Sequence, residues 1–141
     1  EGIFSFIQAT LDTSQKNPTV VMPNPFYKIY EGAAHLAGGK PYYVNSSKEE
    51  GFKPNFESIP EEIWLDCQLL ILCSPSNPTG YTMGEKEYLK VLELAEKYDF
   101  LVCSDECYID LSLRILSVDQ TRFYSCISLR EARVLLADNQ Q

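Results

Sequence analysis

Basic residues are scarce in this sequence. Lysine and arginine together number 12, against 20 aspartates and glutamates, which gives a net charge of −8 at pH 7. A negatively charged surface repels phosphate backbones and anionic lipids, so neither nucleic acid nor a membrane surface is expected as a partner. Long hydrophobic runs are also lacking, and the run at 69–73 is far too short to span a bilayer.

Metal-ligand patterns are equally sparse. The only histidine is His35, and the five cysteines form no Cys-x-x-Cys pair. Cys73 and Cys103 stand at the ends of apolar runs, where a free thiol behaves as a small core residue. We therefore expect reduced thiols and a cytoplasmic location, in preference to disulfides or a metal site.

Neither a signal peptide nor a lipidation motif is recognisable, and Glu1 leads directly into a helical pattern. The chain is therefore expected to be a piece of a longer protein. Its 141 residues are 45% hydrophobic and 23% charged, an ordinary globular composition. That length is sufficient for one domain with a hydrophobic core.

Helical and strand-like segments alternate over residues 1–110. Helices are predicted over 2–15, 25–37, 58–64 and 86–98, and strands over 19–23, 41–44, 69–73 and 100–104. Asn24 is the predicted N-cap of the second helix, and Ser58 and Thr82 would begin capping boxes. Helix-linked strands imply parallel pairing, so the predicted fold class is α/β, a mostly parallel sheet with flanking helices.

Residues 111–141 differ from the rest of the chain. They contain leucine-rich patches and a charged stretch but no recognisable motif, and only 130–137 has the pattern of a terminal helix. We therefore divide the chain into a folded unit at 1–110 and an atypical C-terminal tail at 111–141. A frame disruption or a truncation is the favoured origin of the tail.

Three polar residues follow the ends of two predicted strands. Asn77 lies in the Pro- and Gly-rich turn after the 69–73 strand, and Asp105 and Tyr108 follow the next strand. Because parallel strands end at the same sheet edge, these side chains should meet there. A carboxylate can hold a proton on a ring nitrogen, while an amide and a phenol hydrogen-bond a ring oxygen. A pyridoxal ring needs this combination.

Each residue also has a purely structural interpretation. Asn77 could simply stabilise its turn, Asp105 could cap the segment that follows, and Tyr108 could be a core aromatic. Cys107 is more readily a spectator than a nucleophile, because no basic partner is visible in the sequence. The convergence of the first three residues favours the ligand site.

The stretches at 74–80 (SPSNPTG) and 104–108 (SDECY) resemble the large domain of class I/II aminotransferases, the fold-type-I enzymes that use pyridoxal 5′-phosphate. The stretch at 23–33 (PNPFYKIYEGA) resembles the succinyldiaminopimelate aminotransferase branch of bacterial lysine biosynthesis. The similarity covers residues 1–110. The N-P-x-G turn alone is weak evidence for the family, but the three stretches in combination are specific to it.

The resemblance implies a role for each candidate residue. Asn77 and Tyr108 would hydrogen-bond the phenolic oxygen of the cofactor, and Asp105 would pair with its pyridine nitrogen. Tyr27 would stack on the ring, although a tyrosine at a helix start is often only a packing residue. The peptide bonds before Pro75 and Pro78 would be cis.

The resemblance also implies parts that this chain lacks. No serine has a lysine three residues later, so the Schiff-base lysine of the family's Ser-x-x-Lys motif is absent and no catalytic residue is assigned. A glycine-rich phosphate loop would lie immediately upstream of Glu1, and the arginine that binds the substrate carboxylate would lie in a separate small domain. The chain is thus expected to be an inactive part of the cofactor-binding large domain.

The parent reaction implied by the resemblance is glutamate-dependent transamination of N-succinyl-2-amino-6-ketopimelate. Its partners would be small amino and keto acids, and the parent would be a homodimer. Two alternatives stay open from the sequence. One is another fold-type-I enzyme, such as a carbon–sulfur lyase, and the other is a binding remnant without chemistry.

Overall fold

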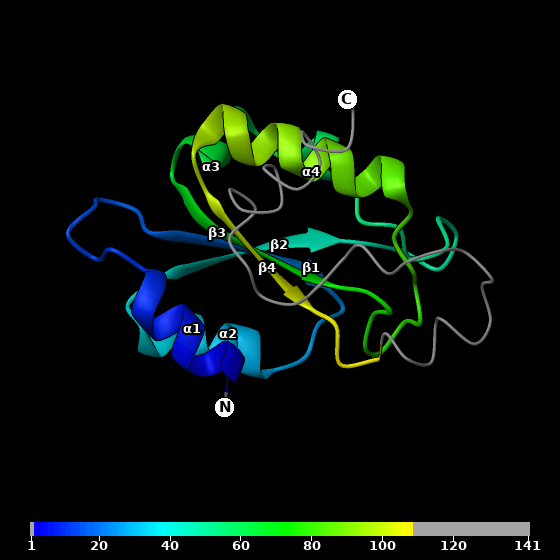
Figure 1. Ribbon diagram of the computed structural model, residues 1–141, viewed down its shortest axis with the longest axis horizontal. Coiled ribbons are helices and arrows are strands. Elements are labelled where there is room, and N and C mark those ends of the chain that lie inside the picture. The colour runs from blue at the N-terminus through cyan, green and yellow to red at the C-terminus, as the bar shows by residue number, and fades with distance from the viewer. Residues whose placement is uncertain (1, 109–141) are drawn as a thin grey trace, which may run out of the picture.

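The computed structural model describes residues 2–108, which form a single parallel sheet between two layers of helices (Figure 1). Its strands are β1 (Thr19–Asn24), β2 (Lys40–Asn45), β3 (Cys67–Cys73) and β4 (Leu101–Asp105). They lie in the order β2-β1-β3-β4, and every neighbouring pair is parallel. The predicted α/β class is therefore confirmed.

The helices divide between the two faces of the sheet. They are α1 (Gly2–Thr10), α2 (Ile29–Leu36), α3 (Glu61–Leu65) and α4 (Glu85–Tyr98), with a short 3-10 helix η1 at Phe56–Ser58. Helices α1 and α2 cover one face, and α3 and α4 cover the other (Figure 1). Right-handed crossovers between parallel strands produce this arrangement.

Both faces of the sheet are buried. On β3, Leu69 and Ile71 pack toward α1 and α2, while Leu70 and Leu72 pack toward α3 and α4. All four side chains are at most 2% exposed. Burial on both faces explains why this strand appears in the sequence as a continuous apolar run without alternation.

The predicted N-cap role of Asn24 is wrong. Asn24 is the last residue of β1, where it pairs in register with Asn45 and its Nδ2 donates to Asn45 Oδ1 at 2.7 Å. The backbone N–H of Ser46 donates to its carbonyl at 2.9 Å and continues the pairing. Because strand pairing engages the residue, α2 begins only at Ile29.

Both predicted capping boxes are also misplaced. Ser58 lies in η1, and Pro60 is the N-cap of α3. The N-cap of α4 is Gly84, two residues after Thr82, and its N–H donates to Glu87 Oε2 at 2.9 Å. The spacing that favours a capping box is therefore present at α4, but it starts two residues later.

Within residues 2–108, none of the four cysteines forms a disulfide: Cys67, Cys73 and Cys103 are buried, and Cys107 is exposed. The same residues contain no cluster of side chains suited to a metal ion and no helix long and apolar enough to cross a membrane. Cys126 and the helix predicted at 130–137 lie outside the described residues.

Candidate functional site

The ends of β3 and β4 meet at one edge of the sheet. Cys73 and Asp105, the last residues of the two strands, are register partners, and the N–H of Ser74 donates to the Asp105 carbonyl at 3.3 Å. Asn77 lies four residues beyond Cys73, and its N–H donates to Cys73 Sγ at 3.4 Å. The geometry thus supports the predicted approach of Asn77 to Asp105 at this edge.

The turn that carries Asn77 is closed by backbone hydrogen bonds. The N–H of Gly80 donates to the Ser76 carbonyl at 2.7 Å, and the N–H of Ser76 donates to the Tyr81 carbonyl at 2.8 Å. Gly80 has φ of +74°, a left-handed conformation that favours glycine. The peptide bonds before Pro75 and Pro78 are both cis, as expected, and so is the bond before Pro25.

Asp105 is held by a residue that sequence reasoning missed. Tyr30 of α2 is fully buried, and its hydroxyl donates to Asp105 Oδ2 at 2.5 Å. The other oxygen, Oδ1, accepts the N–H of Cys107 at 3.3 Å. Burial raises the pKa of Tyr30 far above its usual value, and the hydrogen bond to Asp105 raises it further. Tyr30 therefore stays protonated and remains a donor.

Tyr27 lies at the same edge through its contact with Tyr30. The two rings meet edge to face, with centroids 5.9 Å apart. Tyr27 is 52% exposed and Tyr108 is 38% exposed. Tyr30 thus touches both the predicted stacking residue and the predicted ring-nitrogen partner, Asp105.

Several polar groups at this edge are available to a ligand. Among residues 2–108, no hydrogen bond engages the side-chain amide of Asn77 or the hydroxyls of Tyr27 and Tyr108. The Asp105 carboxylate, the Asn77 turn and Tyr27 therefore lie at one edge of the sheet, and Tyr108 follows Asp105 by three residues. This set offers both donors and acceptors to a polar aromatic ring.

The thiol of Cys107 is unsuited to nucleophilic chemistry. Partial desolvation and the neighbouring Asp105 carboxylate raise its pKa to about 11, so it is a neutral thiol at pH 7. His35 is exposed, on α2. The interpretation of Cys107 as a spectator agrees with this chemistry.

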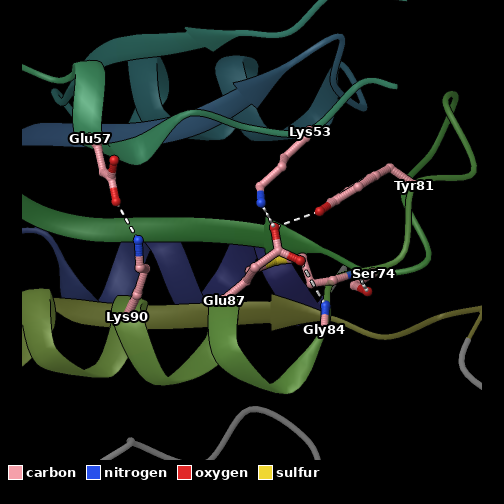
Figure 2. A network of polar contacts seen from close by, with 8 residues as sticks. Lys53, Glu57, Ser74, Tyr81, Gly84, Glu87 and Lys90 are labelled. Carbon is pink, nitrogen blue, oxygen red and sulfur yellow. Dashed lines mark hydrogen bonds and ion pairs between the residues drawn. The ribbon is translucent and has the colours of Figure 1, made fainter. Parts of the chain in front are cut away.

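A polar network anchors the segment that follows the Asn77 turn (Figure 2). The carboxylate of Glu87, on α4, accepts the Tyr81 hydroxyl at 2.5 Å and the Gly84 N–H at 2.9 Å, and pairs with Lys53 at 3.4 Å. Partial burial raises the pKa of Glu87, but these donors outweigh burial and lower it below its usual value. The ionised carboxylate is thus favoured in the folded chain.

This lowered pKa predicts a pH dependence. A carboxylate with a depressed folded-state pKa stabilises the fold above its unfolded pKa and loses that contribution as pH falls through the folded value. Glu87→Gln should cost about 1 kcal/mol at pH 7, and this cost should shrink as the pH is lowered below about 4. Urea unfolding of both chains over a pH series measures it. A cost that grows at acidic pH would contradict the prediction.

A family model for class I and II aminotransferases matches residues 2–136. The chain belongs to this family. It is 31% identical over 112 residues to the LL-diaminopimelate aminotransferase of Syntrophobacter fumaroxidans, an alignment that covers 79% of the chain and 28% of that protein. The family predicted from the sequence is therefore confirmed.

Solved aminotransferase structures share the fold. Aminotransferase AspB of Helicobacter pylori is 38% identical, with a TM-score of 0.72 over 98% of the chain and 33% of that structure. A probable N-succinyldiaminopimelate aminotransferase of Thermus thermophilus is 25% identical, with a TM-score of 0.67 over 74% of the chain and 27% of that structure. The chain spans a third or less of the length of these relatives.

Class I and II aminotransferases are pyridoxal-phosphate enzymes, as the sequence resemblance implied. The described edge fits that cofactor by the chemistry of its groups. Asp105 supplies a negative charge oriented by Tyr30, and Asn77 and Tyr108 supply polar groups not engaged within residues 2–108. These side chains are therefore chemically suited to a pyridine ring bearing an oxygen.

Proposed function

We propose that this chain is the ring-binding part of a pyridoxal-phosphate-dependent aminotransferase. Asp105 binds the pyridine nitrogen, Asn77 and Tyr108 bind the phenolic oxygen, and Tyr27 stacks on the ring. The observation that carries this proposal is the meeting of Asp105, fixed by Tyr30, with the Asn77 turn at paired strand ends.

The surroundings of these side chains support the proposed roles. When bound, pyridoxal phosphate supplies an electron sink for amino-group transfer. The negative charge of the Asp105 carboxylate would keep a proton at the ring nitrogen. The Tyr30 hydroxyl and the Cys107 N–H hold that carboxylate in place. The Asn77 amide and the Tyr108 phenol orient the ring through its oxygen, and the Tyr27 ring shields one face from water.

The proposed substrates are small amino and keto acids. Within that class we propose glutamate-dependent transamination of N-succinyl-2-amino-6-ketopimelate by the whole protein. The stretch at 23–33 and the likeness to the Thermus thermophilus protein support this substrate. The Syntrophobacter fumaroxidans relative is named for LL-diaminopimelate, a compound with the same diaminopimelate skeleton but no succinyl group. That name supports a substrate with this skeleton.

We further propose that the segment itself does not catalyse transamination, because its sequence contains no Ser-x-x-Lys motif. A homodimeric parent and a cytoplasmic location are part of the same proposal. That Cys67, Cys73 and Cys103 form no disulfide supports the reducing compartment.

Chemical trapping tests this absence of a catalytic lysine. Borohydride converts any linkage between a lysine and pyridoxal phosphate into a stable amine, which mass spectrometry of tryptic peptides locates. The full-length Helicobacter pylori aminotransferase should be labelled at one lysine, whereas this chain should show only scattered, substoichiometric labelling. Stoichiometric labelling of a single lysine, for example Lys28 beside Tyr27, would contradict the proposal.

A further inference from the structure

We propose that Tyr81 and Glu87 are positioning residues for Asn77, and that they fix its turn against the start of α4. This inference rests on the proposed function, because it assigns Asn77 to the cofactor ring. Neither residue belongs to the ring-binding set, and each acts through the turn.

Tyr81 connects the turn to the helix through two different groups. Its backbone carbonyl accepts the Ser76 N–H at 2.8 Å and so closes the turn around Asn77. Its hydroxyl donates to Glu87 Oε1 at 2.5 Å. A displacement of the Tyr81 side chain therefore shifts the residue that closes the turn.

Glu87 joins three segments of the chain. Its Oε2 accepts the Gly84 N–H at the start of α4, while Oε1 is approached by both Tyr81 and Lys53 (Figure 2). Its side chain is 20% exposed, so solvent screens these contacts less than it screens an open surface pair. The carboxylate is thus the common acceptor that holds the turn, the helix and the loop containing Lys53.

The far end of this segment is fixed independently. Ser74 is 5% exposed, and its hydroxyl oxygen accepts the Met83 N–H at 2.9 Å. With both ends anchored, the residues between Ser74 and Gly84 form a loop with little freedom to move as a whole. The position of Asn77 within that loop then depends on its own N–H bond to Cys73 and on the contacts of Tyr81.

Close packing does not replace these hydrogen bonds on one side of the turn. A small pocket lies there, lined by residues that include Phe52, Pro54, Ser76, Thr79 and Tyr81. Tyr81 borders this pocket and on its other side packs against the core cluster that contains Leu72 and Met83. Its directional bond to Glu87 therefore adds to that packing in holding this part of the loop.

The chain offers a matched control one helical turn away. Lys90 of α4 pairs with Glu57 of η1, and both side chains are well exposed (Figure 2). This pair links α4 to η1, close to the pair formed by Lys53 and Glu87, but it makes no hydrogen bond or ion pair with residues 74–84. Glu57→Gln thus removes the same charge as Glu87→Gln without touching the turn.

The test compares Tyr81→Phe, Glu87→Gln and Glu57→Gln with the wild-type chain. Amide hydrogen exchange is measured by NMR at Ser76 and Gly80, with amides of β3 as internal references. Tyr81→Phe and Glu87→Gln, the two clamp variants, should each speed exchange at the two turn amides about tenfold relative to the β3 amides. Glu57→Gln should leave exchange there unchanged. Exchange at wild-type rates in both clamp variants would overturn the inference, as would an equal acceleration in Glu57→Gln.

A titration with pyridoxamine 5′-phosphate tests whether the position of the turn affects cofactor binding. This compound forms no covalent bond to a lysine, so the missing lysine does not prevent its binding. Affinity should fall about fivefold in Tyr81→Phe and Glu87→Gln and stay unchanged in Glu57→Gln. Faster exchange without weaker binding would refute the positioning role. If the wild-type chain binds none, the proposed function fails, and exchange alone then decides whether Tyr81 and Glu87 fix the turn.

Discussion

The Asp105→Asn variant should bind pyridoxamine 5′-phosphate about 30-fold more weakly than the wild-type chain, a loss of about 2 kcal/mol. Asparagine has almost the same shape, and its amide oxygen can still accept the Tyr30 hydroxyl, although its NH2 group cannot accept the Cys107 N–H. It carries no negative charge, so it no longer favours a protonated ring nitrogen. Titration followed by the cofactor's absorbance measures the change.

Glu106→Gln is the matched control for this experiment. Glu106 is the next residue along the chain, and the substitution removes the same charge one position away. Its affinity should stay within about twofold of wild type, because a charge without direct contact is screened by solvent. Equal losses in the two variants would indicate a general electrostatic effect and would remove the specific role of Asp105.

The Tyr30→Phe variant should lose about 2 kcal/mol of unfolding free energy. The Tyr30 hydroxyl is buried and donates to a carboxylate, and bonds of that kind are stronger than those between neutral groups. Without it, Asp105 keeps only the N–H and the thiol of Cys107 as donors among the described residues. Urea unfolding at pH 7 measures the loss.

Tyr43→Phe is the control for Tyr30→Phe. The Tyr43 hydroxyl also donates to a carboxylate, that of Glu31, but at a more accessible position on β2. The Tyr43→Phe substitution should cost under about 1 kcal/mol of unfolding free energy, because water can replace the lost hydrogen bond there. A Tyr30→Phe chain as stable as wild type would show that the bond to Asp105 contributes nothing to the fold.

The Tyr30→Phe and Asp105→Asn substitutions can also be combined in one chain. Because Tyr30 and Asp105 are in direct contact, their effects on stability should be less than additive by about 1 kcal/mol. Strict additivity in the double variant would mean that the hydroxyl acts on some other group. This double-mutant cycle separates the hydrogen bond from the effect of each side chain on packing.

The sheet could be predicted from the sequence because its strands are buried on both faces. Leu69 to Cys73 forms one short apolar run before a Pro-rich turn, which leaves few alternatives to a central strand. The placement of Asn77 and Asp105 followed, since parallel strands end at one edge. That part of the site depends on topology, and topology was readable from the order of the elements.

The errors arose where long-range pairing competes with a local pattern. Asn24 followed by Pro25 has the local character of a helix start, but Asn45 on the neighbouring strand engages it instead. At α4 the capping spacing fits two starting residues, and the choice of Gly84 depends on the position of Glu87 in the folded chain. Single-sequence patterns carry no information about such partners.

Tyr30 could not be found from its own neighbourhood. Its helical spacing from Tyr27 marks it only as a residue of the buried face of α2. Its partner Asp105 lies 75 residues away, and the fold alone brings the two together.

NMR mapping of cofactor binding tests the central claim most directly. In a ¹H–¹⁵N spectrum of the wild-type chain, pyridoxamine 5′-phosphate should shift the side-chain amide of Asn77 and the backbone N–H of Cys107. Those shifts should saturate, and at a ligand concentration near the wild-type Kd Asp105→Asn should reduce them to a small fraction. Shifts that are absent, or that map to the opposite sheet edge near Thr19 and Lys40, would contradict the proposed pyridoxal site.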